Sequence, residues 1–307
     1  MNNPFHEGEL KVQRLTGEEE KAQRNGQIIK DEILSGALGF IAKQTMAILG
    51  SVSKTNGKHW ASIVSGNSGF FYADEPRVLT LNLNQTNVIK TDPVWQNIES
   101  GERLGILFIE LETRRRLKVN GRIESHDASH IRIAVEESYP LCPKYIQRRK
   151  LDLTSDTKLC DSELSEGYLL EHKAKQIISR SDTAFLVTSH PARGLDVSHR
   201  GGKKGFLKVM SEDLIRCPDY SGNGMFNSFG NLDKNPESGL VVVDFKNALA
   251  LQLTGTATME LNQKDEENET GGTSRFWKFK VESWKLQPLN LMQSEFLDYS
   301  PFLPSSE

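Results

Sequence analysis

The sequence contains little cysteine and no long apolar run. Its three cysteines, Cys142, Cys160 and Cys217, form no C-x-x-C pair, which argues against a disulfide framework, a zinc ribbon or a dithiol redox motif. No run of about 18 apolar residues occurs, so a membrane-spanning helix is not expected. The opening decapeptide, MNNPFHEGEL, has neither the basic nor the apolar region of a secretory signal. We therefore expect a cytoplasmic protein, because sparse, unpaired cysteines suit a reducing compartment.

Strong charge of either sign is also absent. The 38 Lys and Arg residues and the 41 Asp and Glu residues give a formal net charge of -3 over 307 residues. Such a chain has no global field that would attract nucleic acid or an anionic membrane, and neither is expected as a partner. Hydrophobic residues make up 37% of the chain, which is enough for packed cores. The length suits two domains of ~100–200 residues each.

The most informative feature that is present is an internal repeat. Residues 105–121, GILFIELETRRRLKVNG, align without a gap to residues 239–255, GLVVVDFKNALALQLTG. The offset is 239 − 105 = 134. It stays near this value where 69–70 matches 205–206, an offset of 136, and where Ala47 matches Ala184, an offset of 137. Matches that keep their order along the chain indicate a duplicated domain.

Each copy has the pattern of an antiparallel β domain. Short apolar or alternating runs, separated by turn residues, predict about six strands and one short helix in ~85 residues, which is typical of a small barrel. The predicted fold class is mainly β with α (α+β), with two tandem six-stranded barrels. Charge and apolar spacing predict helices at 17–38, 130–138 and 162–176, and the acidic, Gly-rich stretch 263–274 predicts a mobile loop. The expected domains are a helical segment at 1–38, a first barrel at 39–126, a helical connector at 127–178, a second barrel at 179–287 and a loose tail at 288–307.

Two loops of the second copy carry residues suited to binding. The loop 196–204 offers Ser198, Arg200, Lys203 and Lys204 around a Gly pair, and a phosphate dianion is bound by several such donors that converge on it. The alternative is a solvated basic hairpin. The loop 218–231 contains Gly222-x-Gly224 without the third Gly or the βαβ unit of a dinucleotide fingerprint. It is either the start of a helix whose amides face an anion or a turn that uses Asn and Gly for their conformational freedom.

The first copy lacks both elements, so we place the candidate site in the second copy. The first copy instead carries Arg114, Arg115 and Arg116 at the turn between its last two strands. These arginines either form a solvated hairpin or reach the other half of the chain or a ligand phosphate.

Residue sets for catalysis or metal binding are sparse. Adjacent Ser and His residues at 189–190 and 198–199 point to opposite faces of a strand, which is a poor geometry for a nucleophile and its base. The seven His residues form no metal-binding pair, so no metal site is expected. Cys217 is interpreted as a small buried apolar residue rather than a reactive thiol.

These motifs together resemble a known family. The runs DVSHRGGKKGFLKV at 196–209, CPDYSGNGMFNSFGNL at 217–232 and LQLTG at 251–255 resemble the pyridoxamine 5′-phosphate oxidase-like, FMN-binding split-barrel superfamily. Further runs, FHEGE at 5–9, RRRLKVNG at 114–121 and CPKYIQR at 142–148, are similar to a less characterised branch whose members carry two split barrels in one chain. Leu141 stands where that branch typically has Asn.

The resemblance implies an FMN cofactor and a homodimer, in which sites form between two barrels. It implies a flavin-dependent oxidoreductase of an unidentified small substrate or electron donor. A flavin carrier or sensor without turnover, or a haem-binding split barrel with His199 or His190 as axial ligand, are the alternatives. The residues that it nominates for cofactor binding are Asp196, Ser198, Arg200, Lys203, Pro218, Asp219, Asn223, Gly224, Asn227 and Gln252. No catalytic residue is nominated, and the pyridoxamine phosphate reaction is not carried over.

Overall fold

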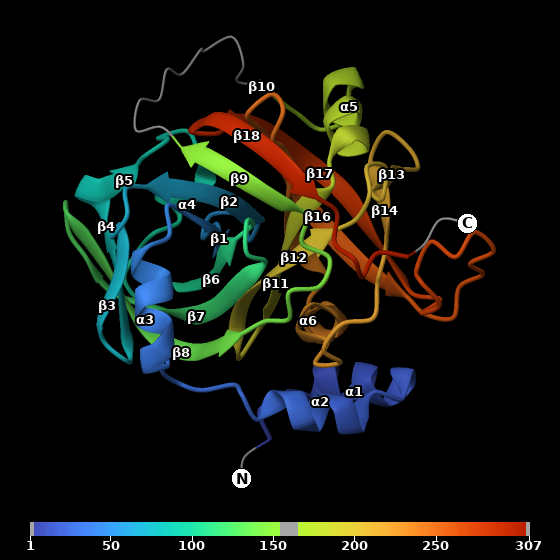
Figure 1. Cartoon of the computed structure of the whole chain (residues 1–307), viewed down its shortest axis with the longest axis horizontal. Helices are drawn as coiled ribbons and strands as arrows, with labels where there is room; N and C mark the ends of the chain where they lie inside the picture. The colour runs from blue at the N-terminus through green and yellow to red at the C-terminus, as the bar shows by residue number, and fades with distance from the viewer. Residues whose placement is uncertain (1–2, 154–164, 305–307) are drawn as a thin grey trace.

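The computed structural model describes residues 3–153 and 165–304, and it consists mainly of two curled antiparallel sheets that lie side by side (Figure 1). The first sheet has the order β3 (Phe71–Glu75), β4 (Val78–Asn82), β8 (His130–Pro140), β7 (Arg115–His126), β6 (Arg103–Glu110), β1 (Met46–Val52), β2 (His59–Gly66) and β5 (Thr86–Asn87). The second has the order β13 (Lys208–Val209), β14 (Leu214–Pro218), β17 (Phe276–Pro288), β16 (Leu249–Glu260), β15 (Glu237–Asp244), β11 (Thr183–His190) and β12 (Gly194–Gly201). The short strand β10 (Ser165–Gly167) pairs with β17. The predicted fold class, mainly β with α in two tandem domains, is confirmed, but each sheet has eight strands among the described residues where six were predicted.

The two sheets share one topology. Except for β5, the strands of the first sheet take the positions of β13, β14, β17, β16, β15, β11 and β12 in the same order. Strand register agrees with the sequence repeat. Gly105 pairs with Gly50 in the first sheet, and Gly239 pairs with Val187 in the second. Gly239 follows Gly105 by 134 residues and Val187 follows Gly50 by 137, as in the sequence repeat. We refer to the two units as barrel 1 and barrel 2.

This topology corrects the prediction for the connector. Residues 130–138 were expected to be helical, but they form most of strand β8, which is the counterpart of β17. The physical reason is a period of two, since Ile131, Ile133 and Val135 are buried while Arg132 is exposed. Barrel 1 therefore extends to Pro140. The second predicted helix, 162–176, begins outside the described residues, and the observed helix is α5 (His172–Arg180).

The chain termini also differ from prediction. In place of one helix at 17–38, the structure has α1 (Glu7–Thr16), α2 (Glu19–Gly26) and α3 (Ser35–Ala42). Gly17 ends α1 in the left-handed conformation, with φ 68°. The tail is not loose, because β18 (Leu291–Asp298) pairs with β9 (Arg148–Leu153), and this ribbon crosses the two barrels (Figure 1). No helix in the described part of the chain is long and apolar enough to cross a membrane.

Apolar side chains form one core inside each barrel and a third core between them. The third core joins β1, β6 and β2 to β11, β12 and β15 through residues such as Ile48, Leu107, Phe185, Val197 and Val241. Two equivalent glycines allow the backbones to approach here. A Cβ atom on Gly239 would lie 2.9 Å from the His59 carbonyl oxygen, and one on Gly105 would lie 3.1 Å from Val197. The two barrels therefore cover each other's apolar faces within one chain.

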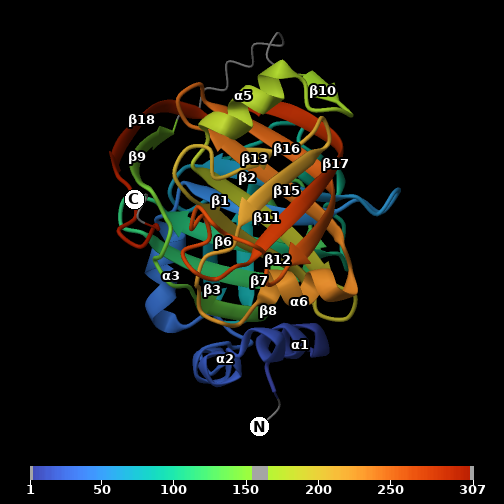
Figure 2. The ribbon, with the colours of Figure 1, turned by 90° about the vertical axis from the view of Figure 1, so that its right-hand side faces the viewer.

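Helices close one end of this pair. In Figure 2, α1 and α2 lie below the barrels and beneath α6 (Asn227–Lys234). Helix α1 contacts α6 so closely that a Cβ atom on Gly8 would lie 2.2 Å from the Gly230 carbonyl oxygen. Helix α4 (Pro93–Gln96) occupies the position in barrel 1 that α6 occupies in barrel 2, between the fourth strand and the next long strand.

Candidate functional site

A pocket lies where barrel 1 meets the α6 end of barrel 2. Its interior volume is about 130 Å³. Barrel 1 and the segment that follows β8 contribute Arg116, Lys118, Leu141, Cys142, Lys144 and Tyr145. Barrel 2 contributes residues of three segments: Ser198, His199, Arg200, Gly201 and Phe206; Cys217, Pro218, Asp219, Tyr220, Gly222, Asn223 and Gly224; and Phe226, Asn227, Ser228 and Phe229.

Cationic side chains from both barrels line this pocket. Arg116 donates from Nε to the Cys142 carbonyl oxygen at 2.8 Å, and burial lowers its pKa to about 10, so it remains charged at neutral pH. Among the described residues, it has no acidic partner within 4.0 Å, and Arg200 has only Asp219, at 3.5 Å. The Arg200 Nε atom is buried without a hydrogen-bond partner there. Two guanidinium groups are therefore incompletely neutralised, which favours an anionic ligand.

Lys118 adds a third cation from barrel 1. It forms an ion pair with Asp196, and both side chains are almost fully buried. Lys118 Nζ also lies 3.4 Å from Ser198 Oγ, which donates to Asp196 Oδ2 at 2.9 Å. Asp196 thereby neutralises Lys118 and orients Ser198 at the pocket wall.

His199 is buried beside these cations. Neither ring nitrogen has a hydrogen-bond partner within the described ranges. Burial, with the nearby Arg116 and Arg200, lowers the pKa of His199 well below its ordinary value, so the ring is neutral at pH 7. A buried imidazole with two unsatisfied nitrogens indicates that a ligand or water completes its hydrogen bonds.

Asp219 also lines the pocket and forms an ion pair with Arg275. Arg275 donates from Nε to Asp219 Oδ2 at 2.9 Å and also reaches Glu18 of the N-terminal segment at 3.0 Å. Burial raises the pKa of Asp219 from its ordinary value, against the opposing effect of Arg200 and Arg275. This buried network holds the loop that follows β14 against the turn before α2.

The pocket loop ends at an open helix terminus. Phe226 has φ 58° and precedes α6 without a side-chain cap from any described residue. Amides at the start of a helix that has no cap are donors for an anion. The rings of Tyr145 and Tyr220 contact each other at a tilt of 37°, with centroids 4.8 Å apart, and Tyr145 donates to the Ser221 carbonyl oxygen at 2.8 Å. Both half-buried rings line the pocket, and we refer to them as its aromatic rim.

Asn223 and Asn227 serve the loop and the N-terminal helices. Asn223 accepts from Asn25 through its carbonyl oxygen at 2.7 Å, and its side chain accepts from the Met225 amide at 3.0 Å. Asn227 donates to Glu9 at 2.5 Å and accepts from Tyr139. Burial raises the pKa of Glu9 to about 8. Both amides therefore already have protein partners.

The structure brings most of the predicted site residues together. Ser198, Arg200, Pro218, Asp219, Asn223, Gly224 and Asn227 line the pocket, and Asp196 lies behind Lys118. Lys203 lies in a separate surface hollow with Tyr220 and Leu303. Gln252 is on the other side of the interface, where it donates to Ala61 and Ser62 of barrel 1. Cys217 is 1% exposed and burial raises its pKa, as expected of an inert thiol.

Sequence reasoning nominated no residue of barrel 1 for the site and left open whether the arginines at 114–116 reach the other half of the chain or a ligand phosphate. Of the three arginines at 114–116, only Arg116 enters the pocket, while Arg115 is exposed and Arg114 is bonded to Ile146 and to the Asp298 carboxylate. Lys118 was not nominated either. The internal repeat could have identified Lys118, because Lys118 is the counterpart of the nominated Gln252 at the offset 252 − 118 = 134.

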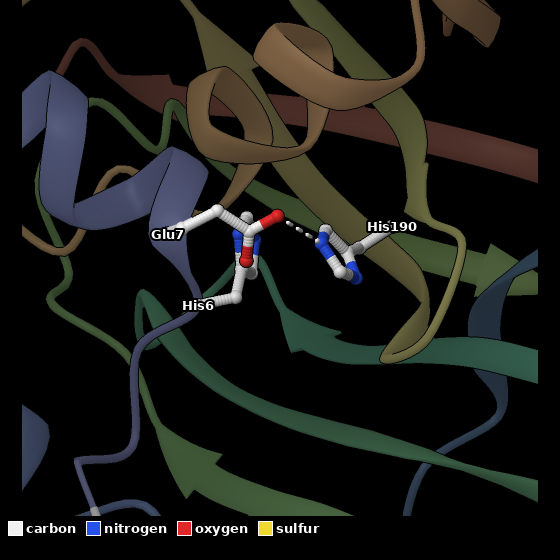
Figure 3. A group of neighbouring side chains, drawn as sticks. All are labelled: His6, Glu7 and His190. Atoms are coloured by element: carbon white, nitrogen blue, oxygen red, sulfur yellow. Dashed lines mark hydrogen bonds and ion pairs between the residues drawn. The ribbon is translucent and has the colours of Figure 1, made fainter.

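A cluster of His6, Glu7 and His190 lies on the α1 side of barrel 2 (Figure 3). Its potential ligand atoms lie within 4.8 Å of one another. However, His6 accepts from the Gly8 amide through Nδ1 and contacts Asn231 through Nε2, and burial lowers its pKa to about 4. Both ring nitrogens of His6 are occupied, so the cluster fits an anchor for α1 better than a metal centre.

Comparisons with known proteins are informative only at the level of fold. No protein-family model and no curated protein matches the sequence. HupZ of Group A Streptococcus matches at 14% identity, with 42% of this chain and 97% of that chain covered and a TM-score of 0.29. A Clostridium acetobutylicum protein of the pyridoxinephosphate oxidase family matches at 13% identity, with 41% and 92% covered and a TM-score of 0.30.

An F420 reductase matches at 12% identity, with 37% of this chain and 94% of that chain covered and a TM-score of 0.27. Each match covers about the length of one barrel. A likeness at this level assigns no activity. Among the solved structures to which this chain is similar, the Clostridium acetobutylicum protein is described as a member of the pyridoxinephosphate oxidase family.

Proposed function

We propose that this chain binds FMN in the pocket between barrel 1 and the α6 end of barrel 2. The observation that carries the proposal is the convergence of Arg116, Arg200 and His199 on one pocket beside the start of α6. Within the described residues, the His199 ring nitrogens have no partner and α6 has no side-chain cap. A phosphate group would satisfy the two guanidinium groups and the free amides together. Ser198 would add a hydroxyl to the same group.

The size of the pocket limits what it encloses. The pocket volume of about 130 Å³ is smaller than the ~300–1,000 Å³ of sites that enclose a whole small molecule. The ring of a flavin would therefore lie outside the inner pocket, toward the rim of Tyr145 and Tyr220. Binding of the whole cofactor would require one of the two segments that carry these tyrosines to move outward.

The proposed activity is oxidation or reduction of a small molecule. A bound flavin supplies hydride and electron transfer by itself. The chain's residues would hold the phosphate through Arg116 and Arg200, exclude water with the aromatic rim, and keep the site positively charged. The substrate and the electron donor are unidentified. A flavin carrier or sensor without turnover is the alternative use of the same site.

A second candidate, haem binding, rests on His199. Its neutral ring has two nitrogens without partners in the described part of the chain, and an axial haem ligand requires one free ring nitrogen. His190 is less suited, because its Nδ1 accepts from the Ala192 and Arg193 amides. The two guanidinium groups beside His199 favour the phosphate over the iron.

One experiment separates these proposals. The full-length protein is purified, its absorbance spectrum is recorded, and any chromophore released on denaturation is identified by mass. Flavin absorbance and the mass of FMN support the first proposal, and a Soret band supports the second. If the protein is colourless and binds neither added FMN nor haem, both are wrong. Anaerobic addition of NADH or NADPH then distinguishes an oxidoreductase, whose flavin is bleached, from a carrier.

Two further proposals concern organisation. The shared topology and register support an origin of the two barrels by internal duplication. A homodimer and a cytoplasmic location stay predictions. The site does not depend on the homodimer, because barrel 1 of the same chain supplies Arg116 and Lys118.

A further inference from the structure

The two barrels contact each other through a reciprocal pair of interactions. Lys118 of barrel 1 reaches Ser198 of barrel 2 at 3.4 Å, and Gln252 of barrel 2 reaches Ser62 of barrel 1 at 3.1 Å. Gln252 is the counterpart of Lys118, at an offset of 134, and Ser198 is the counterpart of Ser62, at an offset of 136. The strand pairings β1 with β2 and β11 with β12 give the same match. Barrel 1 therefore has a position equivalent to the pocket of barrel 2.

The cations of the pocket are absent from this equivalent position. Strand register places Val64 where barrel 2 has Arg200. It also places Ala250 and Gln252 where barrel 1 contributes Arg116 and Lys118. Three charged side chains are thus replaced by neutral ones. An external anion would lack these three cations there, although Lys285 lies close enough to favour a negative charge.

An internal carboxylate lies at this position instead. Asp92 accepts from Ser62 Oγ at 2.5 Å and from the Val94 amide at 2.9 Å through Oδ1, and from Gln252 Nε2 at 3.0 Å through Oδ2. It is 4% exposed and caps α4, the counterpart of the uncapped α6. Burial raises its pKa only to about 6, so most of the group is ionised at pH 7.

We infer that barrel 1 holds a closed counterpart of the pocket, in which the Asp92 carboxylate takes the place of an anionic ligand group. Each chain then binds one ligand, in the pocket of barrel 2 alone. This inference rests on the proposed function for the identity of that ligand. The serine, the helix start and a side chain from the opposite barrel recur in both positions. In barrel 2, Ser198 and Lys118 contact Asp196 on β12, which leaves the two arginines and the start of α6 for a ligand.

The first test is stoichiometry. Calorimetric titration of the full-length protein with FMN is expected to give one equivalent per chain. Two equivalents would overturn the inference while supporting the proposed function. If no FMN binds, the proposed function fails, and the inference is decided by the second test, which uses no flavin.

The second test replaces the internal anion with an external one. In Asp92→Ser, the hydroxyl still caps α4, but Ser62 and Gln252 lose their acceptor. Acetate at 100 mM is expected to raise the midpoint of thermal unfolding of this variant by about 3 °C more than that of the wild type, because binding to the folded state stabilises it. Sodium chloride at the same ionic strength is the control for screening.

An equal rise in the wild type and the variant, or no rise in the variant, would overturn the inference. If Asp92→Ser does not fold, Ser62→Ala is the second variant that tests the inference, and it is expected to disturb the fold less. It removes a donor and leaves the carboxylate, so acetate is then expected to have no specific effect. A specific acetate effect in Ser62→Ala would show that the carboxylate does not occupy the position.

Discussion

Lys118 and Asp196 form a buried ion pair that joins barrel 1 to barrel 2, with their side chains 1% and 6% exposed. Two charges at such a position are tolerated because each neutralises the other. Ser198 and the ring of Tyr139 complete the surroundings of the ammonium group. The pair therefore links the stability of the barrel interface to the shape of the candidate site.

Removing one member of this pair should destabilise the whole chain. Lys118→Met keeps the volume of the side chain but leaves Asp196 as an unpaired buried charge, which typically costs about 3–5 kcal/mol. Chemical denaturation measures the loss in the free energy of unfolding. Lys43→Met is a matched control, because the ion pair of Lys43 with Glu110 is far more exposed. Equal losses in the two variants would contradict a special role for the buried pair.

Arg200 should matter for cofactor affinity, whereas Arg115 should not. Arg200 lines the pocket and has an unpartnered Nε within the described residues, so Arg200→Ala removes a charge-assisted contact of ~1.5–3 kcal/mol and weakens FMN at least about tenfold. Arg115 is exposed, so Arg115→Ala is the control. Fluorescence titration with FMN measures the dissociation constant of each variant. The site is misplaced if Arg115→Ala abolishes binding and Arg200→Ala does not.

Glu9 should make stability depend on pH. Its pKa is raised from 4.5 to about 8 by burial, so the folded state binds more protons than the unfolded state between these values. Its contribution is therefore present below about pH 4.5 and is lost as the pH rises to 8, at up to about 1.4 kcal/mol per pH unit. Glu9→Gln should remove this slope. The comparison with the wild type isolates Glu9 from His6, whose lowered pKa acts in the opposite direction.

Denaturation curves collected between pH 5 and pH 8.5 provide the measurement. Glu19→Gln is the control, because Glu19 lies in the neighbouring helix α2 with an exposed side chain. It should leave the slope of the wild type unchanged. A slope that survives in Glu9→Gln would show that another group carries the proton.

The sequence predicted the barrels better than the segments outside them. The strands of each copy follow from apolar runs bounded by turn residues, and the repeat checked each assignment against its counterpart. The repeat was followed only as far as Gly121 and Gly255, so β8 was missed although its alternation is as clear as that of β17. Helix α1 was missed because its start depends on the capping box of His6 and Glu9, which is a local geometry.

The sequence predicted only the part of the candidate site that barrel 2 contributes. Motifs in one stretch of chain nominated Ser198, Arg200 and the loop before α6. Arg116 and Lys118 come from the other barrel, and their place in the pocket follows from how the barrels pack. Gln252 was nominated for cofactor binding, but it lies outside this pocket and donates to Ala61 and Ser62, because the reciprocal arrangement of the two barrels is a tertiary property.

The barrel interface gives a final prediction, which concerns Gly239. A Cβ atom there would lie 2.9 Å from the His59 carbonyl oxygen and 2.9 Å from the Trp60 carbonyl carbon, so Gly239→Ala forces β15 away from β2. Overpacking of this kind costs about 1–3 kcal/mol. Gly39→Ala in α3 is the matched control, since nothing lies within 4 Å of its Cβ position, and alanine should stabilise that helix by up to about 1 kcal/mol. Thermal unfolding should therefore move in opposite directions for the two variants. A Gly239→Ala protein as stable as the wild type would mean that the barrels do not pack against each other at this strand.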